Sequence, residues 1–327
     1  MNIRVVHRSN GRVWPALLAG VVTVLLFIFA SAATSRAAAG RQAFFASPEA
    51  AVEALVAAAR ADDLKSMQTI LGPGSAELIS SGDSVADNLS REKFVAAYAQ
   101  QHALEAKSTS TMILYVGRDD WAMPIPIVKQ GKGWGFDIGQ GKEEILNRRI
   151  GRNELHVIEV IDAYVAAQHE YASKDCRGDG KVEFAQRFIS SPGSRDGLYW
   201  QVGEGEEESP LGPLLARAGQ EGYGAEGSLS PFYGYYYKIL KEQGEHATGG
   251  PYSYVVKEKM ILGFALLAYP AEYGNSGVMT FMVNQEGIIF EKDLGEKTRS
   301  LAEAITAYNP DASWKKVKEL VAPAQGN

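Results

Sequence analysis

The sequence predicts an α+β protein in which helices and an antiparallel sheet are followed by a long helix packed on a carboxy-terminal antiparallel sheet. Three observations support this. Alanine-rich segments with helical spacing lie between residues 47 and 103, and an amphipathic stretch covers 153–172. Strand-favouring residues alternate with glycines over 231–295, the pattern of a β-meander. The mature chain, at about 290 residues, is long enough for two cores.

The amino terminus predicts an export signal over residues 1–39. Basic residues between Arg4 and Arg12 precede a largely apolar run over 13–33, and Ala37 and Ala39 occupy the small positions of an A-x-A cleavage site. We therefore expect cleavage after Ala39 and a periplasmic or secreted protein. The run is about 20 residues long, enough to cross a bilayer, so an uncleaved anchor is the alternative.

Charge and cysteine content narrow the classes of partner. The formal net charge is −6, which disfavours nucleic acid and anionic lipid as partners. The chain has one cysteine, Cys176, so an intramolecular disulfide is excluded. A membrane contact is expected only through the amino-terminal segment, if that segment is not cleaved.

The first unit is expected over 44–147. Ser47 and Pro48 are typical of a helix start, and this helix should end near residue 61. Asp62 or Asp63 then caps a short helix that ends at Leu71, and a third helix is expected over 91–103. Strands are predicted over 109–116, 121–128 and 134–138, with prolines 124 and 126 placing the second at an edge or bulge.

The second unit is expected over 148–322. Its long helix over 153–172 carries His156 and His169, but these lie too far apart for the His-Glu-x-x-His zinc motif. Asp175 begins a glycine-rich segment that departs from a calcium loop and reads as a turn. A final helix over 298–307 and the segment 314–320 should close this unit. We expect no metal or cofactor.

Tyrosines of the carboxy-terminal meander are the candidate site residues. Aromatic faces with polar tips suit a carbohydrate or peptide groove, whereas tyrosines in strands also pair across a sheet. Both interpretations stay open. The residues that would line such a groove are Tyr233, Tyr235, Tyr237, Tyr252, Tyr269 and Tyr273.

Several segments together resemble the bacterial family of exported proteins known as domain of unknown function 2950. They include Arg148 to Glu154, Asp196 to Trp200, Ser209 to Pro213, Gly263 to Pro270 and Asp293 to Gly295, and the likeness covers roughly residues 44–320. The resemblance implies export and assigns no catalytic or binding residue.

Each unit also has a looser likeness. Residues 44–145 resemble the cone-shaped nuclear-transport-factor-2-like fold, which implies a small-molecule site built from acids and histidine. The carboxy half resembles the globular part of type IV pilins and pseudopilins, without their processing site. Under the first resemblance the candidate residues are Asp83, Asp87, His102, Asp119 and Asp120. His102 also fits a role at a helix carboxy terminus.

These observations favour a non-enzymatic binding or assembly protein of the cell envelope, with another envelope protein or polymer as partner. One alternative is a hydrolase that acts on an envelope polymer through paired carboxylates, one of them with a raised pKa. A pilin-like structural subunit is the other alternative.

Overall fold

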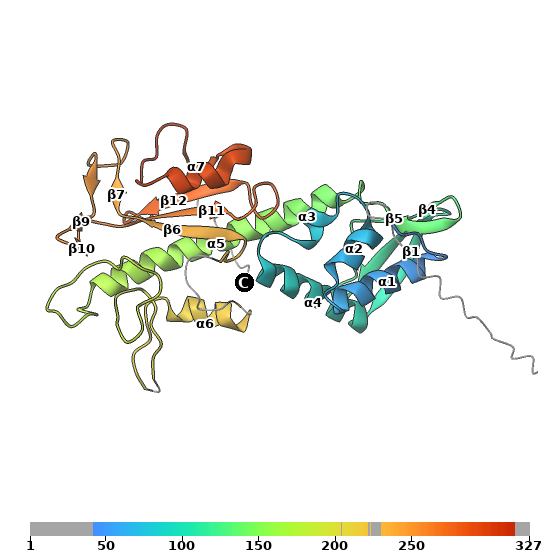
Figure 1. Cartoon of the computed structure of the whole chain (residues 1–327), viewed down its shortest axis with the longest axis horizontal. Helices are drawn as coiled ribbons and strands as arrows, with labels where there is room; N and C mark the ends of the chain where they lie inside the picture. Colours follow the sequence, from blue (N-terminus) through green and yellow to red (C-terminus); the bar gives the residue numbers. More distant parts are fainter. Residues whose placement is uncertain (1–41, 204, 222, 224–229, 318–327) are drawn as a thin grey trace, which may run out of the picture. The chain divides into compact units, whose positions relative to one another are not determined.

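The computed structural model describes residues 42–317, except 204, 222 and 224–229 (Figure 1). The expected export signal and residues 318–322 of the second unit lie outside the described residues. Within the part described, no helix combines the length and apolar character needed to span a bilayer. The fold is mixed α+β, with amino-terminal helices and an antiparallel sheet, a long helix, and a carboxy-terminal antiparallel sheet. The predicted fold class is confirmed.

The helix starts read from capping residues are confirmed. The Ser47 hydroxyl accepts a hydrogen bond from the Ala50 N–H at 3.2 Å and begins α1, Pro48–Arg60. The Asp63 carboxylate accepts one from the Ser66 N–H at 3.0 Å and begins α2, Leu64–Leu71. A short helix that the sequence did not indicate, α3, covers Ala76–Ile79.

The helix expected over 91–103 begins earlier and ends earlier. It is α4, Ser84–Gln100, and its true cap is Asp83, which accepts from the Ala86 N–H at 3.0 Å. His102 therefore lies in a strand, β1, His102–Ser108, rather than in a helix. Apart from Leu104, every side chain of β1 is exposed, so the strand lacks the apolar alternation by which it could have been recognised.

The amino-terminal sheet is antiparallel with the order β1-β2-β4-β5, and β3 pairs with β2. The strand expected over 121–128 is divided at its prolines, which cannot donate to a ladder. Helix α1 packs its apolar stripe against this sheet in one buried cluster. The remaining strands are β2, Thr111–Val116; β3, Trp121–Ala122; β4, Ile127–Gln130; and β5, Gly133–Phe136.

The long helix α5 covers Lys142–Ala172 and is longer than the expected 153–172. The predicted boundary at 147/148 falls inside it, and the division into two units stays a prediction. The residue before α5, Gly141, has φ +105°, and a Cβ there would lie 2.2 Å from the Pro124 carbonyl oxygen. Only glycine fits this contact between the segment that joins β3 to β4 and the start of the helix.

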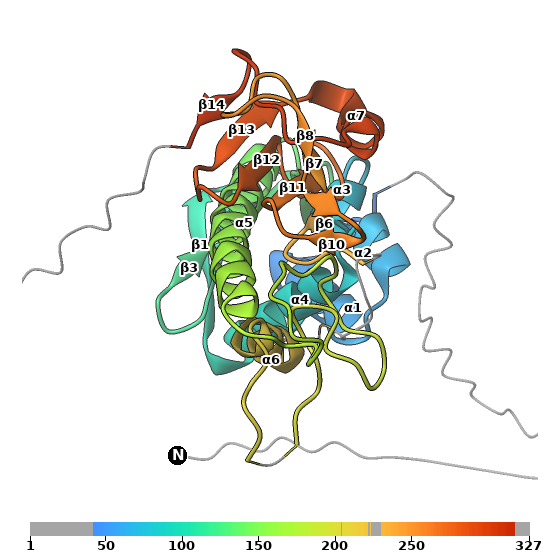
Figure 2. The same cartoon turned by 90° about the vertical axis from the view of Figure 1, so that its left-hand side faces the viewer.

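The carboxy-terminal sheet is antiparallel with the order β14-β13-β12-β11-β6. All residues of β11 are buried, so both faces of the sheet centre are covered. Helix α5 packs on one face, and α7, Thr298–Ala304, lies on the other (Figures 1 and 2). The strands are β6, Tyr235–Leu240; β11, Ala265–Pro270; β12, Met279–Asn284; β13, Phe290–Asp293; and β14, Lys315–Lys316.

The predicted meander is interrupted between its first two long strands. After β6 the chain forms two small two-stranded sheets and returns as β11. Helix α6, Gly212–Gln220, precedes this region, and a 3-10 turn over Gly295–Lys297 leads into α7, which ends three residues before the expected position. The small strands are β7, Glu242–Gln243; β8, Tyr252–Ser253; β9, Val255–Val256; and β10, Lys259–Met260.

Polar contacts connect the segment around α3 to the carboxy-terminal half. The Arg149 guanidinium on α5 donates to the carbonyls of Glu77 and Leu78 and to the Asn275 side chain. Asn275 in turn donates to the Ser80 carbonyl at 2.8 Å. These bonds satisfy the exposed carbonyls at the end of α3, where a short helix leaves its last groups unpaired.

Candidate functional site

An apolar hollow with a volume of about 520 Å³ lies between α5, α6 and β6. We call it the aromatic cavity. This volume is within the range of small-molecule pockets, which are mostly apolar with a few polar groups. Its apolar and aromatic lining comes from Val85, Val160, Tyr164, Phe188, Ile189, Tyr199, Leu211, Leu214, Leu215, Ala216, Ala218, Tyr223, Pro231, Phe232 and Tyr237.

The polar end of the aromatic cavity is the carboxylate of Asp83, which is 1% exposed. Its Oδ2 accepts hydrogen bonds from the Tyr223 hydroxyl and the Gly234 N–H, both at 2.8 Å. Its Oδ1 accepts a hydrogen bond from the Ala86 N–H and so caps the start of α4. Burial raises the pKa of Asp83 above its ordinary value, and the bonds from Ala86, Gly234 and Tyr223 oppose that rise.

The polar groups of the aromatic cavity are already engaged within the protein. Both Asp83 oxygens already accept bonds from the protein, and Tyr164 donates to the Ala265 carbonyl at 3.4 Å. Burial raises the pKa of Tyr223 and of Tyr164, so both phenols stay neutral. The described lining includes no Lys, Arg or His. A neutral or cationic apolar ligand therefore fits better than an anionic one.

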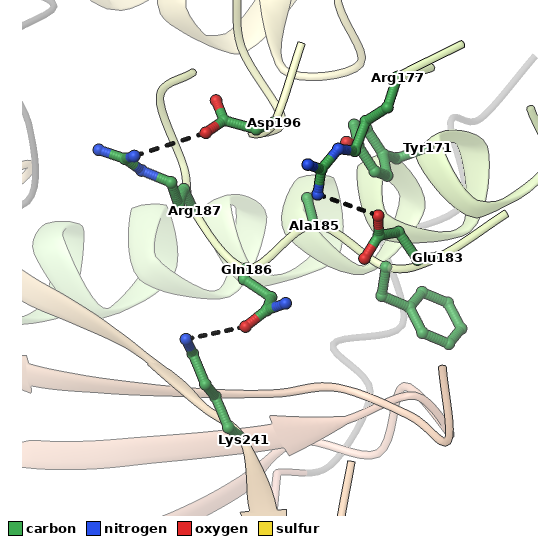
Figure 3. A pocket seen from close by; sticks show the side chains of 9 residues that line it. Tyr171, Arg177, Glu183, Ala185, Gln186, Arg187, Asp196 and Lys241 are labelled. Atoms are coloured by element: carbon green, nitrogen blue, oxygen red, sulfur yellow. Dashed lines mark hydrogen bonds and ion pairs between the residues drawn. The ribbon is translucent and has the colours of Figure 1, made fainter. Parts of the chain in front are cut away.

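A smaller polar pocket, with a volume of about 230 Å³, lies beside α5 (Figure 3). Two acids line it, and each is paired with an arginine. Glu183, which is 5% exposed, accepts from Arg177 at 3.2 Å. Asp196 lies 3.5 Å from the Arg187 guanidinium. The arginine pairing neutralises both acids within the pocket.

The polar pocket does not match the carboxylate pair expected of a hydrolase. Burial alone would raise the pKa of Asp196, but hydrogen bonds from the Ser191 N–H, the Ser194 hydroxyl and the Ser191 hydroxyl, together with Arg187, lower it to about 2. A general acid needs a pKa close to the working pH instead. Asp83, whose pKa is raised, lines the aromatic cavity and not this pocket.

A third hollow, with a volume of about 530 Å³, runs beside β6. We call it the edge groove. One wall is the segment 186–192, and the other is formed by residues 237–239 and Lys241, with Tyr269 nearby. Lys241 reaches from just beyond the end of β6 to the Gln186 side chain at 3.0 Å (Figure 3). Tyr237 lines both this groove and the aromatic cavity.

Of the six candidate tyrosines, Tyr237 and Tyr269 come together at the edge groove. Tyr233 is 7% exposed and its ring lies 4.4 Å from that of His156. Tyr235 is fully buried and donates to the Met279 carbonyl at 2.9 Å.

The other two tyrosines lie away from that groove. The Tyr252 ring is 5.6 Å from that of Tyr254, and Tyr273 donates to Asp293 at 3.2 Å. Cross-strand pairing also occurs in this sheet, where Tyr269 faces Tyr236 in register with their rings 5.6 Å apart.

The acids and histidine proposed for the amino-terminal unit do not form one site. Asp87 accepts from the N–H and hydroxyl of Ser81 at 2.8 Å each, which holds the turn before α4. Asp120 accepts from Gln101, and Asp119 is exposed. The His102 Nδ1 lies 2.9 Å from the Tyr98 carbonyl in the last turn of α4, consistent with a role at a helix carboxy terminus.

The glycine-rich segment after α5 is a turn. The Asp175 carboxylate accepts from the Asp179 and Gly180 N–H groups, at 3.1 and 2.7 Å, and so is occupied by its own backbone. Cys176 is half-buried, and burial raises the pKa of its thiol. Within the described ranges, no group of three or more His, Cys, Asp or Glu side chains is placed to hold a metal ion.

Comparison with known proteins identifies a family of unknown activity. The family model described as "Protein of unknown function (DUF2950)" matches residues 42–317, and the chain belongs to this family. No curated protein and no solved structure matched the chain. The resemblance seen in the sequence is thereby confirmed at the level of the family.

Residues that the sequence analysis did not single out form much of these sites. Tyr223 and Gly234 meet Asp83 from 140 and 151 positions away, and no local motif marks that contact. Arg187 and Lys241 likewise join from distant segments. The one available signal was the aromatic density around residues 231–237, which did indicate Tyr237.

Proposed function

We propose that this protein is a non-enzymatic binding protein of the cell envelope that holds an apolar ligand in the aromatic cavity. The observation that carries the proposal is the cavity itself, with a volume of about 520 Å³, an aromatic lining and a polar end whose carboxylate is fully hydrogen-bonded. The basic and apolar amino-terminal segment with its A-x-A end supports a location outside the cytoplasm.

The ligand class follows from the lining. An acyl or isoprenoid chain would bury its surface against leucine, phenylalanine and tyrosine side chains, at about 25 cal/mol per Å² of apolar area removed from water. The only charged group in the described lining is Asp83, so an anionic head group would meet an unfavourable potential there. We therefore infer a chain with a neutral or cationic end.

The finer structural likenesses belong to the same proposal. Helices followed by an antiparallel sheet are compatible with a nuclear-transport-factor-2-like unit, a class in which small molecules bind inside the fold. A long helix against an antiparallel sheet is compatible with a pilin-like unit that supports assembly. Both readings fit a protein that binds rather than reacts.

Displacement of Nile red, a neutral apolar dye, tests the proposal. Dodecanol and dodecylamine should displace it from the purified protein, and dodecanoate should be about tenfold weaker, which is equivalent to about 1.4 kcal/mol. Equal displacement of the dye by all three compounds would show that the charge of Asp83 does not select the ligand. No saturable dye binding at all would reject the cavity as a ligand site.

Two variants at one position locate the binding. Leu214 on α6 lines the cavity, so Leu214→Trp should fill it and lower dye affinity about tenfold, whereas Leu214→Ala should keep or improve binding. The matched control is Leu301→Trp on α7, which is 46% exposed and absent from the lining. Dye binding that survives Leu214→Trp unchanged would place the dye elsewhere and contradict the proposal.

A further inference from the structure

β6 is the last strand of the carboxy-terminal sheet on one side. It pairs with β11 through the register Tyr235↔Pro270 to Leu240↔Ala265, and no described strand pairs along its other side. An edge strand leaves alternate backbone N–H and C=O groups free to bond to another chain. Which residues of β6 carry those free groups follows from its turn contacts.

The contacts of Tyr235 show which residues of β6 direct their backbone groups away from β11. Its carbonyl accepts from the Phe232 N–H at 2.8 Å, and its N–H donates to the Phe232 carbonyl at 3.2 Å, so both groups of Tyr235 face away from β11. In an antiparallel ladder every second residue faces the same way. Tyr237 and Ile239 therefore direct their N–H and C=O groups to the open side, where no described residue bonds to them.

The open stretch has defined ends. The Phe232 bridge occupies the start of the edge, and the Lys241 carbonyl accepts from the Tyr254 N–H at 2.8 Å just beyond its end. Between these contacts lies the edge groove, lined by residues 237–239 and Lys241. At about 3.3 Å per residue, this stretch accommodates an extended segment of about four or five residues.

The opposite wall also offers backbone groups. The Tyr199 N–H donates to the Phe188 carbonyl, and the Tyr199 carbonyl accepts from the Ser190 N–H, both at 2.8 Å. This parallel bridge places the N–H and C=O of Ile189 on the side away from Tyr199, where no described residue bonds to them. An extended chain in the groove therefore has possible partners on both walls.

The charge of the groove indicates the side chains that it would accept. Arg187, Lys238 and Lys241 line it, whereas no Asp or Glu occurs in the described lining, although the chain as a whole has a net charge of −6. Arg187 is already paired with Asp196, and the Lys238 ammonium donates to the carbonyls of Glu303 and Ile305. Lys241 contacts only the neutral Gln186 side chain among its described partners. An acidic side chain in the groove would give Lys241 an oppositely charged partner.

We propose that the edge groove binds an extended, acidic segment of another polypeptide, which adds a strand to β6. The main-chain bonds would come from Tyr237 and Ile239, and Lys241 would select an acidic side chain. The edge groove adjoins the aromatic cavity, with which it shares Phe188, Ile189 and Tyr237, but the proposal does not depend on a ligand in that cavity. It assigns the protein a polypeptide partner of defined chemistry.

Hydrogen exchange of the purified protein is the first test. The amides of Tyr237 and Ile239 should exchange rapidly, unlike their neighbours Tyr236 and Lys238, which bond to β11. Slow exchange of Tyr237 and Ile239 in the free protein would show that the edge is already occupied, by another part of this chain or by a second copy, and would overturn the proposal.

Peptide binding is the second test. The probe is an octapeptide of alternating glutamate and valine, compared with a lysine–valine peptide and with the acidic peptide N-methylated at every second amide. The acidic peptide should bind at least tenfold more tightly than either control, and it should slow exchange at Tyr237 and Ile239. Equal binding of the N-methylated peptide would exclude strand addition, and equal binding of the lysine peptide would exclude the charge argument.

Charge reversal locates the site. Lys241→Glu should weaken binding of the acidic peptide at least tenfold, and the matched control Lys316→Glu, on the exposed strand β14 at the opposite edge, should leave it unchanged. Ile239→Pro removes an outward N–H without removing a bond to β11, and it should abolish binding. If Lys316→Glu weakens binding as much as Lys241→Glu, the attraction is general to the surface and the proposal fails.

Discussion

The two edges of the carboxy-terminal sheet differ in how they are protected. β14 consists of Lys315 and Lys316, both exposed, and short lysine-bearing edges resist pairing with other chains. β6 is six residues long, and the ammonium of its lysine, Lys238, is turned away to the carbonyls of Glu303 and Ile305 at 2.8 and 2.7 Å. One edge of this sheet is therefore closed to partners, and the other is left open.

The open edge is also the better anchored of the two. Tyr235 at the start of β6 is fully buried, and its hydroxyl donates to the Met279 carbonyl. The preceding Gly234 N–H is held by the buried Asp83 carboxylate. By contrast both side chains of β14 are exposed. A rigid open edge loses little conformational entropy on binding, which is the property of a preorganised site.

The largest expected effect breaks the anchor of β6. Tyr235→Ala should lower the free energy of unfolding by about 3–5 kcal/mol, because it removes a buried aromatic ring and leaves a cavity. Lys315→Ala on β14 should change it by less than about 0.5 kcal/mol. Urea unfolding followed by circular dichroism measures both. Equal losses at the two edges would show that they are anchored alike.

The next effect removes the carboxylate that holds the turn before β6. Asp83→Asn keeps the size of the side chain but replaces one of its two acceptor oxygens with an NH2 donor. That donor would face either the Tyr223 hydroxyl and the Gly234 N–H, or the Ala86 N–H, all of which donate to Asp83 in the wild-type protein. We expect a loss of about 1–3 kcal/mol in the free energy of unfolding, the range for buried groups left unpaired. Asp119→Asn, at an exposed loop position, is the control and should be neutral. A neutral Asp83→Asn would mean that Asp83 does not anchor β6.

A helix or strand could be predicted from the sequence where it is marked by residues close together along the chain. Ser47 and Asp63 were identified as caps because a cap is made with residues three positions away. Strand β1 was missed because its exposed side chains carry no alternation, and α5 was predicted eleven residues too short because Gly151 and the polar residues around it weaken the apolar stripe.

The sites were less accessible to prediction than the fold. Tyrosine density pointed to Tyr237 and Tyr269, which do line the edge groove. Arg187 on the opposite wall, and the partners of Asp83, come from segments that are close only after folding. The open edge itself depends on strand order, and strand order is a property of tertiary packing that a local pattern does not contain.

A smaller effect concerns pH and the same anchor. Burial raises the pKa of Asp83 above 3.8, so between 3.8 and its folded value the native state binds more protons than the unfolded state. The contribution of Asp83 to stability is then fully present below pH 3.8 and declines as pH rises through the folded pKa. The stability advantage of the wild-type protein over Asp83→Asn should therefore grow as pH falls from 7 towards 4. Urea unfolding at pH 7, 6, 5 and 4 measures this, and a constant difference would contradict the raised pKa.

The smallest expected effect tests the protection of β14. Replacing both of its lysines in Lys315→Thr/Lys316→Val should leave the free energy of unfolding within about 0.5 kcal/mol of the wild-type value, because both side chains are exposed. It should nevertheless increase self-association, because the edge loses the charges that oppose strand pairing. Sedimentation velocity at rising protein concentration measures the change, with Lys132→Thr/Lys181→Thr, at two exposed positions outside the strands, as the control for two lost charges. If the double variant stays monomeric whenever the wild-type protein does, the short length of β14 rather than its lysines protects this edge. The contrast between the two edges then depends on the six-residue length of β6 and on the groove beside it.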